Sequence, residues 1–318
     1  MRRSLIVTAA ILMTLRALKC HAEDSFPELV ETGTPQRVEE SIEAGAKVNA
    51  KDEDGWTPLM AAAMSNGNPE VIRVLLEAGS DVDTQEGIGH TALMVAAMGN
   101  DNPEVIRVLL EAGSGVDAQN VLGQTPLMVA AKYNVSAEVT GMLLKAGSDI
   151  HARDGTARTA LILAARYNAS PEVVALLLEA GSEVNARDGI GQTALIAAAR
   201  NRNPEVIKVL LEAGSDISAE NILGQTALMA ATRNKDPEVI SLLLEAGVNV
   251  NARDNLGRTA LMLAAGSSEN PEVIRVLLEA GADAAVEDIF GRIAFDYAKG
   301  NAHLEGTVEF WLLNDTRF

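Results

Sequence analysis

Apolar residues recur at spacings of three and four in a phrase that the chain repeats with little change. Asn68 to Gly79 reads NPEVIRVLLEAG, and close copies begin at Asn102, Ser136, Ser170, Asn203, Asp236 and Asn270. The apolar positions of VIRVLL fall on one face of a helix, whereas Glu70, Arg73 and Glu77 fall on the other. Asn or Ser can cap such a helix, Pro suits its first position and Gly suits its end. Each copy therefore predicts an amphipathic helix with one buried face.

A second phrase precedes each copy and predicts another helix. It has the form T-(P/A)-L-(M/I)-x-A-(A/T), and it begins at Thr57, Thr91, Thr125, Thr159, Thr193, Thr226 and Thr259. Successive Thr positions are 34, 34, 34, 34, 33 and 33 residues apart. A period of this size indicates a stacked array in which each helix pair buries its apolar face against its neighbours. Segments such as SDVDTQEGIG carry Asp and Gly at turn positions and predict hairpin-like loops between units.

These phrases together resemble the ankyrin repeat, whose consensus carries G-x-T-P-L-H, A-A and E-V-V-x-x-L-L-x-x-G-A-x-V-N at this period. The resemblance implies an all-α repeat solenoid of stacked helix-turn-helix units joined by hairpin-like loops. We expect seven repeats over residues 55–290, in the intervals 55–88, 89–122, 123–156, 157–190, 191–223, 224–256 and 257–290. An N-terminal capping half-repeat is expected over 23–54, with Thr34 to Gly45 as its helix, and a C-terminal capping repeat over 291–318.

Three departures from the ankyrin consensus stand out. The usual His of T-P-L-H is replaced in every repeat, by Met60, Met94, Met128, Ile162, Ile196, Met229 and Met262. In the family that His bridges neighbouring units by hydrogen bonds, so we expect apolar packing to take its place, with the methionines filling the core. Ala157 stands where a Gly is expected, and Thr140 with Gly141 weakens the second helix of the third repeat.

The first 22 residues predict a secretory signal peptide. Arg2 and Arg3 precede an apolar stretch from Leu5 to Leu15, and Cys20-His21-Ala22 supplies small residues at a cleavage site. The apolar stretch is too short to span a bilayer, and no second segment of membrane length follows it. We therefore expect an exported bacterial protein, periplasmic or secreted, whose mature chain does not insert into a membrane. A lipid anchor on Cys20 is the alternative, which the preceding Lys disfavours.

The charge and the cysteine content narrow the classes of partner and chemistry. The chain has 26 Lys and Arg against 44 Asp and Glu, a formal net charge of −18. Cleavage would remove four basic residues and the single cysteine, leaving 22 basic against 44 acidic residues. Such a field repels nucleic acid and anionic membranes. A chain without cysteine forms no disulfide, thiol nucleophile or thiolate metal site.

No pattern of catalytic, cofactor-binding or metal-binding residues is found. The four histidines, His21, His90, His151 and His303, lie in different units without a matched carboxylate or nucleophile. The recurring Asp and Asn of V-N-A-R-D are explained by turn chemistry, since they are dispersed one unit apart. We expect a non-enzymatic protein without cofactor or metal.

The first-helix phrases predict a candidate binding surface. The ten residues that start at each repeated Thr contain no Asp or Glu, although they contain several cations. The ankyrin resemblance implies that first helices and loop tips line a concave groove. The candidate partner-binding residues are Lys132, Tyr133, Arg158, Arg166, Tyr167, Arg200, Arg202, Arg233, Lys235 and Arg258. A structural alternative is that cations near the ends of these helices complement the helix dipole.

The loop tips add a row of apolar residues before the Gly of each unit: Ile88, Val121, Leu122, Ile190, Ile222, Leu223, Leu256, Ile289 and Phe290. Such a row marks either a contact surface or tips that lean on one another. The expected function is a monomeric scaffold that binds an acidic protein partner through the groove in an exported compartment. The alternative is a secreted effector or toxin-associated protein that engages a host or competitor protein.

Overall fold

The computed structural model describes residues 25–315, apart from 101, 169, 202 and 234–236. The predicted signal peptide, residues 1–22, lies outside this range. Helices occur in pairs along the chain, and the described residues contain no strand. The first helices of the pairs are α2 (Phe26–Thr32), α4 (Pro58–Ser65), α6 (Ala92–Gly99), α8 (Pro126–Tyr133), α10 (Ala160–Tyr167), α12 (Ala194–Ala198), α14 (Ala227–Ala231), α16 (Ala260–Ser267) and α18 (Ala294–Ala298). The second helices are α3 (Pro35–Glu43), α5 (Pro69–Glu77), α7 (Pro103–Glu111), α9 (Ala137–Lys145), α11 (Pro171–Glu179), α13 (Pro204–Glu212), α15 (Pro237–Glu245), α17 (Glu272–Glu279) and α19 (Val308–Asp315).

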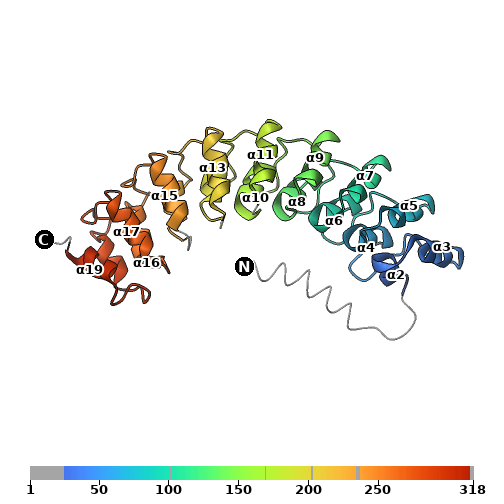
Figure 1. Cartoon of the computed structure of the whole chain (residues 1–318), viewed down its shortest axis with the longest axis horizontal. Helices are drawn as coiled ribbons and strands as arrows, with labels where there is room; N and C mark the ends of the chain where they lie inside the picture. Colours follow the sequence, from blue (N-terminus) through green and yellow to red (C-terminus); the bar gives the residue numbers. More distant parts are fainter. Residues whose placement is uncertain (1–24, 101, 169, 202, 234–236, 316–318) are drawn as a thin grey trace.

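The pairs stack side by side into an arc (Figure 1). The first helices form the inner row of the arc and the second helices form the outer row, so the first-helix phrases lie on the concave side. Each helix packs against its counterpart in the next pair, which is the helical repeat solenoid predicted from the sequence. In the described part of the chain, no helix combines the length and the apolar character needed to cross a bilayer.

The helix boundaries follow from the capping residues of the two phrases. The Thr57 hydroxyl accepts a hydrogen bond from the Met60 N–H (3.3 Å), and the same contact recurs in the other repeats. The Asn68 side chain accepts from the Glu70 N–H at 3.0 Å. Gly79, with φ of +89°, ends the second helix in the left-handed conformation that glycine adopts without steric cost.

The core runs without interruption through the array, because each first helix is enclosed by its neighbours. The methionines and isoleucines at the consensus His position are at most 3% exposed. They serve as core residues, in agreement with the apolar packing expected at this position.

Hydrogen bonds between units are nevertheless present, and they come from a residue that the sequence analysis did not single out. An asparagine follows most first helices and is buried, for example Asn100, Asn168 and Asn201. Its Nδ2 donates to two carbonyl oxygens of the preceding unit, as Asn168 does to Ala131 (3.0 Å) and Asn134 (2.7 Å). We call this set the asparagine ladder: Asn66, Asn100, Asn168, Asn201 and Asn301.

The N-terminal unit is a helix pair and not the half-repeat predicted. Helix α2 lies where no first-helix phrase exists; the Glu28 carboxylate accepts from the Ser25 N–H at 3.1 Å and Pro27 sits in the first turn. Leu29 and Val30 are buried against α4, and the Asn66 amide donates to the Val30 carbonyl. The short S-F-P-E start is a capping sequence, and it was the available signal for this helix.

The loops are hairpin-like, as expected, and are built on a repeated carboxylate or amide. In the loop that leads into the first repeat, the Asp52 side chain accepts from the N–H groups of Asp54 and Trp56, while the Asp52 N–H donates to the Trp56 carbonyl. Backbone hydrogen bonds of 2.8–3.1 Å join successive tips, such as Val121 N–H to the Ile88 carbonyl. Ala157 has φ of +60° at the tip position where the other repeats have glycine, the one non-glycine residue in this conformation among those described.

Thr140 and Gly141 do not shorten the second helix of the third repeat. Helix α9 has nine residues, the same length as α7 and α11. Thr140 is fully buried, and its hydroxyl has no hydrogen-bond partner. The cost of this departure therefore lies in an unsatisfied polar group and not in helix length.

Candidate partner-binding groove

Four cations occupy one register on the concave side of the array. Lys132, Arg166, Arg200 and Arg233 each lie seven residues after the capping Thr of their first helix, in four successive repeats. We call them the groove cations. The same position holds Met64 and Met98 in the first two repeats and Gly266 in the seventh. The row of cations thus begins after two methionines and ends at a glycine.

Two tyrosines lie among the groove cations. The Lys132 Nζ is 4.5 Å from the ring centroid of Tyr133 and 5.3 Å from that of Tyr167, and the Arg166 guanidinium carbon is also 5.3 Å from the Tyr167 centroid. Lys132 and Arg166 therefore lie within twice that distance of each other. The Arg166 guanidinium also donates to the Gln192 amide oxygen of the next repeat at 3.3 Å. The structure thus brings these four candidate residues together through cation–π contacts.

Arg200 lies between two like charges. Burial lowers the pKa of Arg200, and the neighbouring guanidinium groups of Arg166 and Arg233 lower that pKa further. Its Nε atom is buried and lacks a hydrogen-bond partner. No carboxylate oxygen of the described residues lies within 4.0 Å of a groove cation, in contrast to the arginines that form ion pairs elsewhere. In the described part of the chain, the groove cations therefore repel one another without a carboxylate that compensates them.

Arg158 and Arg258 are engaged differently from the groove cations. Each pairs with the carboxylate four residues earlier, at 2.7 Å to Asp154 or Asp254, and both Asp side chains are 1% exposed. Burial acts to raise the pKa of Asp154, but hydrogen bonds from Arg158 and Thr156 outweigh it and hold that pKa below its ordinary value. Both arginines thus stabilise the loop tips, and their charges are neutralised within the turn. Arg202 and Lys235 lie outside the described residues.

The Asp-x-x-x-Arg pattern recurs once more at the C-terminal end. Arg292 pairs with Asp288 at 2.8 Å, and the Tyr297 hydroxyl donates to the same carboxylate at 2.6 Å. Burial raises the pKa of Tyr297 to about 12, with Asp288 adding to the rise. A spacing of four between Asp and Arg at these tips was the sequence signal that identifies Arg158 and Arg258 as turn residues.

The apolar side chains of the loop tips are exposed. Their exposed fractions range from 39% for Leu256 to 70% for Val121. The tips are joined by backbone hydrogen bonds, and their side chains do not cover one another. Thr156 interrupts the row at the tip of the third repeat. An exposed apolar edge accordingly accompanies the first helices along much of the array.

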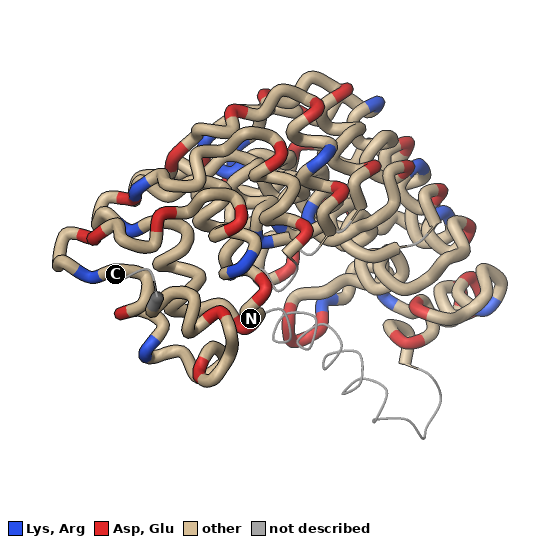
Figure 2. Tube along the Cα trace, turned by 60° about the vertical axis from the view of Figure 1, so that its left-hand side comes forward, with Lys and Arg blue, Asp and Glu red and all other residues tan. Residues whose placement is uncertain are grey.

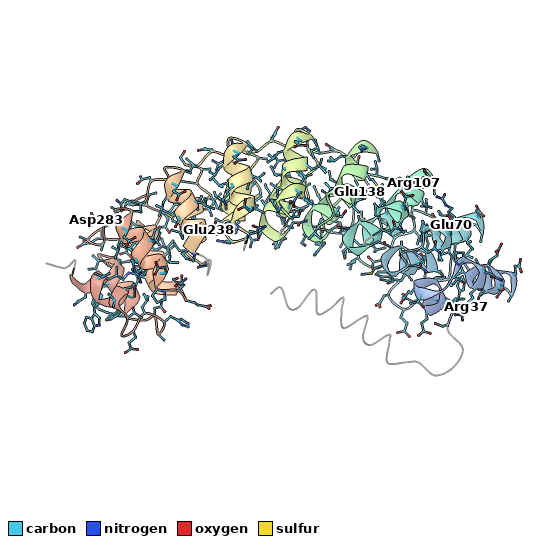
Figure 3. The ribbon with its side chains drawn as sticks, in the orientation of Figure 1. Arg37, Glu70, Arg107, Glu138, Glu238 and Asp283 are labelled. Carbon is cyan, nitrogen blue, oxygen red and sulfur yellow. The ribbon has the colours of Figure 1, made fainter. Side chains whose placement is uncertain are left out.

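The outer helices carry paired charges instead. Arg107 bonds Glu104 and Glu111 on α7, and Lys208 lies 2.6 Å from Glu205 on α13. Acidic and basic residues are interspersed along the trace in Figure 2, and Figure 3 shows Glu70 and Arg107 on the outer helices α5 and α7. Ion pairs at such exposed positions contribute little to stability.

Histidines and carboxylates do not gather into a chemical site. The described residues contain no group of three or more His, Cys, Asp and Glu side chains placed to hold a metal ion. His90 contacts Glu86, with 3.4 Å between Nδ1 and the carboxylate, and His151 lies in a separate loop.

Comparison with protein families agrees with the repeat architecture. The family model for ankyrin repeats, which spans three copies, matches residues 28–120, 63–154, 100–188, 127–221 and 214–288. These matches overlap and together cover residues 28–288, so the chain belongs to the ankyrin-repeat family. Ankyrin repeats form protein-interaction domains, and proteins built from them are generally non-enzymatic scaffolds. A search among curated proteins found no match.

Proposed function

We propose that this protein is a non-enzymatic scaffold that binds an acidic segment of a protein partner through the groove cations. The observation that carries this proposal is the row of four cations that have no carboxylate partner among the described residues, on a chain whose net charge is −18. Like charges in a row destabilise the free protein, and an anionic partner relieves that repulsion. Arg and Tyr are also frequent anchor residues at protein interfaces.

We further propose that the protein acts in an exported compartment after residues 1–22 are removed. The supporting observation is the order of a basic start, an apolar stretch and a small-residue site before Glu23. Mass determination of the chain recovered from the envelope and the medium should give Glu23 as the first residue. Recovery of the full chain in the cytoplasm alone would overturn this part of the proposal.

Two charge-matched variants test the binding surface. The groove variant changes Lys132, Arg166, Arg200 and Arg233 to Ser, and the control variant changes Arg73, Arg107, Lys145 and Lys208 of the outer helices to Ser. Both variants lose four positive charges, so a difference between them reports position and not net charge. With the mature chain as bait in affinity capture from the envelope fraction, the control should retain the partner and the groove variant should lose it.

Added salt should weaken capture by the unchanged protein, because exposed charges are screened over about 8 Å at physiological ionic strength. Thermal unfolding of each bait shows that it is folded. Capture that survives the groove substitutions, or that is lost equally in both variants, would contradict the proposed site.

A further inference from the structure

We infer that the groove recognises an extended segment in polyproline II conformation that carries an acidic residue at every third position. This inference rests on the proposed function and specifies the partner of the same groove. Three observations support it. They are the spacing of the groove cations, the tyrosine rings beside them, and the residues that hold the same repeat position in the repeats before and after the row.

The repeat fixes the spacing of the cations. Because the groove cations share one register, the distance between successive charges follows the distance between stacked first helices, and packed helices lie about 8–10 Å apart. The charges of Lys132 and Arg166 lie at most twice 5.3 Å apart, because each is 5.3 Å from the Tyr167 centroid, and this upper limit is compatible with the spacing.

Polyproline II matches this spacing and also the direction of the side chains. It has three residues per turn and a rise of about 3.1 Å, so every third side chain points the same way at intervals of about 9 Å. A β-strand advances about 10 Å over three residues, but alternate side chains face opposite sides, so its third residue points away. A helix with a rise of about 1.5 Å needs six or seven residues to cover the same distance.

The aromatic residues favour polyproline II over a helix. Proline-rich segments dock into grooves lined by aromatic rings, where their preformed conformation reduces the entropy lost on binding. Tyr133 is 37% exposed beside Lys132, and Tyr167 lies one repeat further on between Lys132 and Arg166. Residues between the acidic positions can pack on these rings.

The ends of the register define the ends of the segment. Beyond Lys132 the same position holds Met98 and Met64, which are partly exposed, and beyond Arg233 it holds Gly266. Apolar residues continuing the three-residue spacing at one end would therefore meet the two methionines, while Gly266 at the other end has no side chain of its own and lies beside Tyr297. The fitting segment is acidic over four positions and apolar at one end.

Three synthetic peptides with four glutamates each distinguish this inference from the general proposal. The spaced peptide is EPPEPPEPPE, the clustered peptide EEEEPPPPPP has the same composition, and a helical peptide places its glutamates seven residues apart. Binding of each to the mature protein is measured by isothermal titration calorimetry. The clustered peptide brings only about two carboxylates to the cations, so the spaced peptide should bind about tenfold more tightly.

Single substitutions in the protein test which of its side chains the spaced peptide contacts. Changing Arg166 to Ser should weaken the spaced peptide more than the clustered one, and changing Met98 to Ser should weaken only a spaced peptide extended by apolar residues. Equal binding of spaced and clustered peptides that still requires the groove cations would overturn the spacing and leave the proposed function standing. Tighter binding of the helical peptide would also overturn it. Failure of every acidic peptide to bind would overturn both.

Discussion

The asparagine ladder and the groove cations repeat along the array with the same period, but they differ in what they contact. Each ladder asparagine is buried and donates to two carbonyls of the preceding unit, as Asn201 does to Ala165 and Asn168. Arg200, by contrast, lies beside two other cations and keeps its Nε without a partner. The ladder asparagines are thus satisfied inside the array, whereas no carboxylate of the described residues neutralises the groove cations.

The two sets also act oppositely on stability. A buried polar group that is hydrogen-bonded costs little, but removing its partner leaves a desolvated group. Like charges in a row lower stability while the protein is free, and this cost is characteristic of binding surfaces. Removal of a satisfied group and removal of an unsatisfied one should therefore change the free energy of unfolding in opposite directions.

The largest effect is expected from the ladder. Changing Asn168 to Ala leaves the carbonyls of Ala131 and Asn134 and the Ser170 N–H without their partner, which should lower the free energy of unfolding by about 3 kcal/mol. Urea denaturation followed by circular dichroism measures this loss. Changing Asn168 to Ser should cost less, because Ser268 occupies the equivalent position and its hydroxyl accepts from the Asn270 N–H. A loss below about 1 kcal/mol for the alanine variant would show that the ladder does not fix the register.

Ala157 tests a loop position where sequence and conformation disagree. A left-handed conformation costs a residue with a Cβ about 1–2 kcal/mol, part of which glycine gives back as greater freedom in the unfolded chain. Changing Ala157 to Gly should therefore raise the free energy of unfolding by about 1 kcal/mol. The matched reverse change is Gly291 to Ala, since Gly291 has φ of +72° and an added Cβ would meet nothing within 4 Å. The two substitutions should change the free energy of unfolding in opposite directions. A Gly291 variant that is more stable than the unchanged protein would contradict the conformational explanation.

The positions that the sequence predicted correctly are those whose role is local. Thr57 caps its helix and Gly79 ends it because of interactions within a few residues, so a single repeat is sufficient to identify them. The register of Lys132 and Arg166 was also available, since it follows from counting along the repeat. Asn168 was missed because an asparagine after a helix is explained equally well as a turn residue, and its two acceptors lie more than thirty residues away.

The sequence could not predict which group each candidate side chain contacts. Arg158 and Arg166 are both cations near a first helix, but one pairs with a buried carboxylate and the other lies over a tyrosine ring. Only the positions of their neighbours in space separate a residue that stabilises a turn from one that faces the groove. The exposed loop tips likewise required the structure, because apolar side chains in a row suit either contact or mutual burial.

Two threonines test whether a missing hydrogen-bond partner always identifies a binding residue. Thr140 and Thr232 are both fully buried, but the Thr140 hydroxyl has no partner whereas the Thr232 hydroxyl donates to the Met229 carbonyl at 2.8 Å. Changing Thr140 to Val should stabilise the protein by about 1 kcal/mol, and changing Thr232 to Val should destabilise it by a similar amount. Thermal unfolding of both variants shows whether each substitution raises or lowers stability. Binding of the spaced peptide should be unchanged by the Thr140 variant, because this residue faces the core of the outer helices; weaker binding would show that the core and the groove are coupled.

The smallest expected effect concerns His90, which directly precedes the capping Thr91 of the second repeat. Its imidazole contacts Glu86 of the loop framework, and the positive charge of Lys132 also acts on it. Burial lowers the pKa of His90, Glu86 opposes that shift, and Lys132 adds to it. The unfolded chain, whose histidine pKa is about 6.5, therefore binds more protons than the folded chain once the pH falls below that value. Stability contributed by neutral His90 is present above pH 6.5 and is lost as the pH falls through the lowered pKa of the folded protein.

Changing His90 to Gln, the residue at the equivalent position in three other repeats (Gln124, Gln192 and Gln225), should remove this dependence. The free energies of unfolding of the two proteins, from urea denaturation between pH 8 and pH 5, should diverge by less than about 1 kcal/mol, with the unchanged protein losing more at the acidic end. If the unchanged protein instead gained stability relative to the Gln variant at low pH, the attraction of Glu86 would outweigh burial, and His90 would belong to the framework alone.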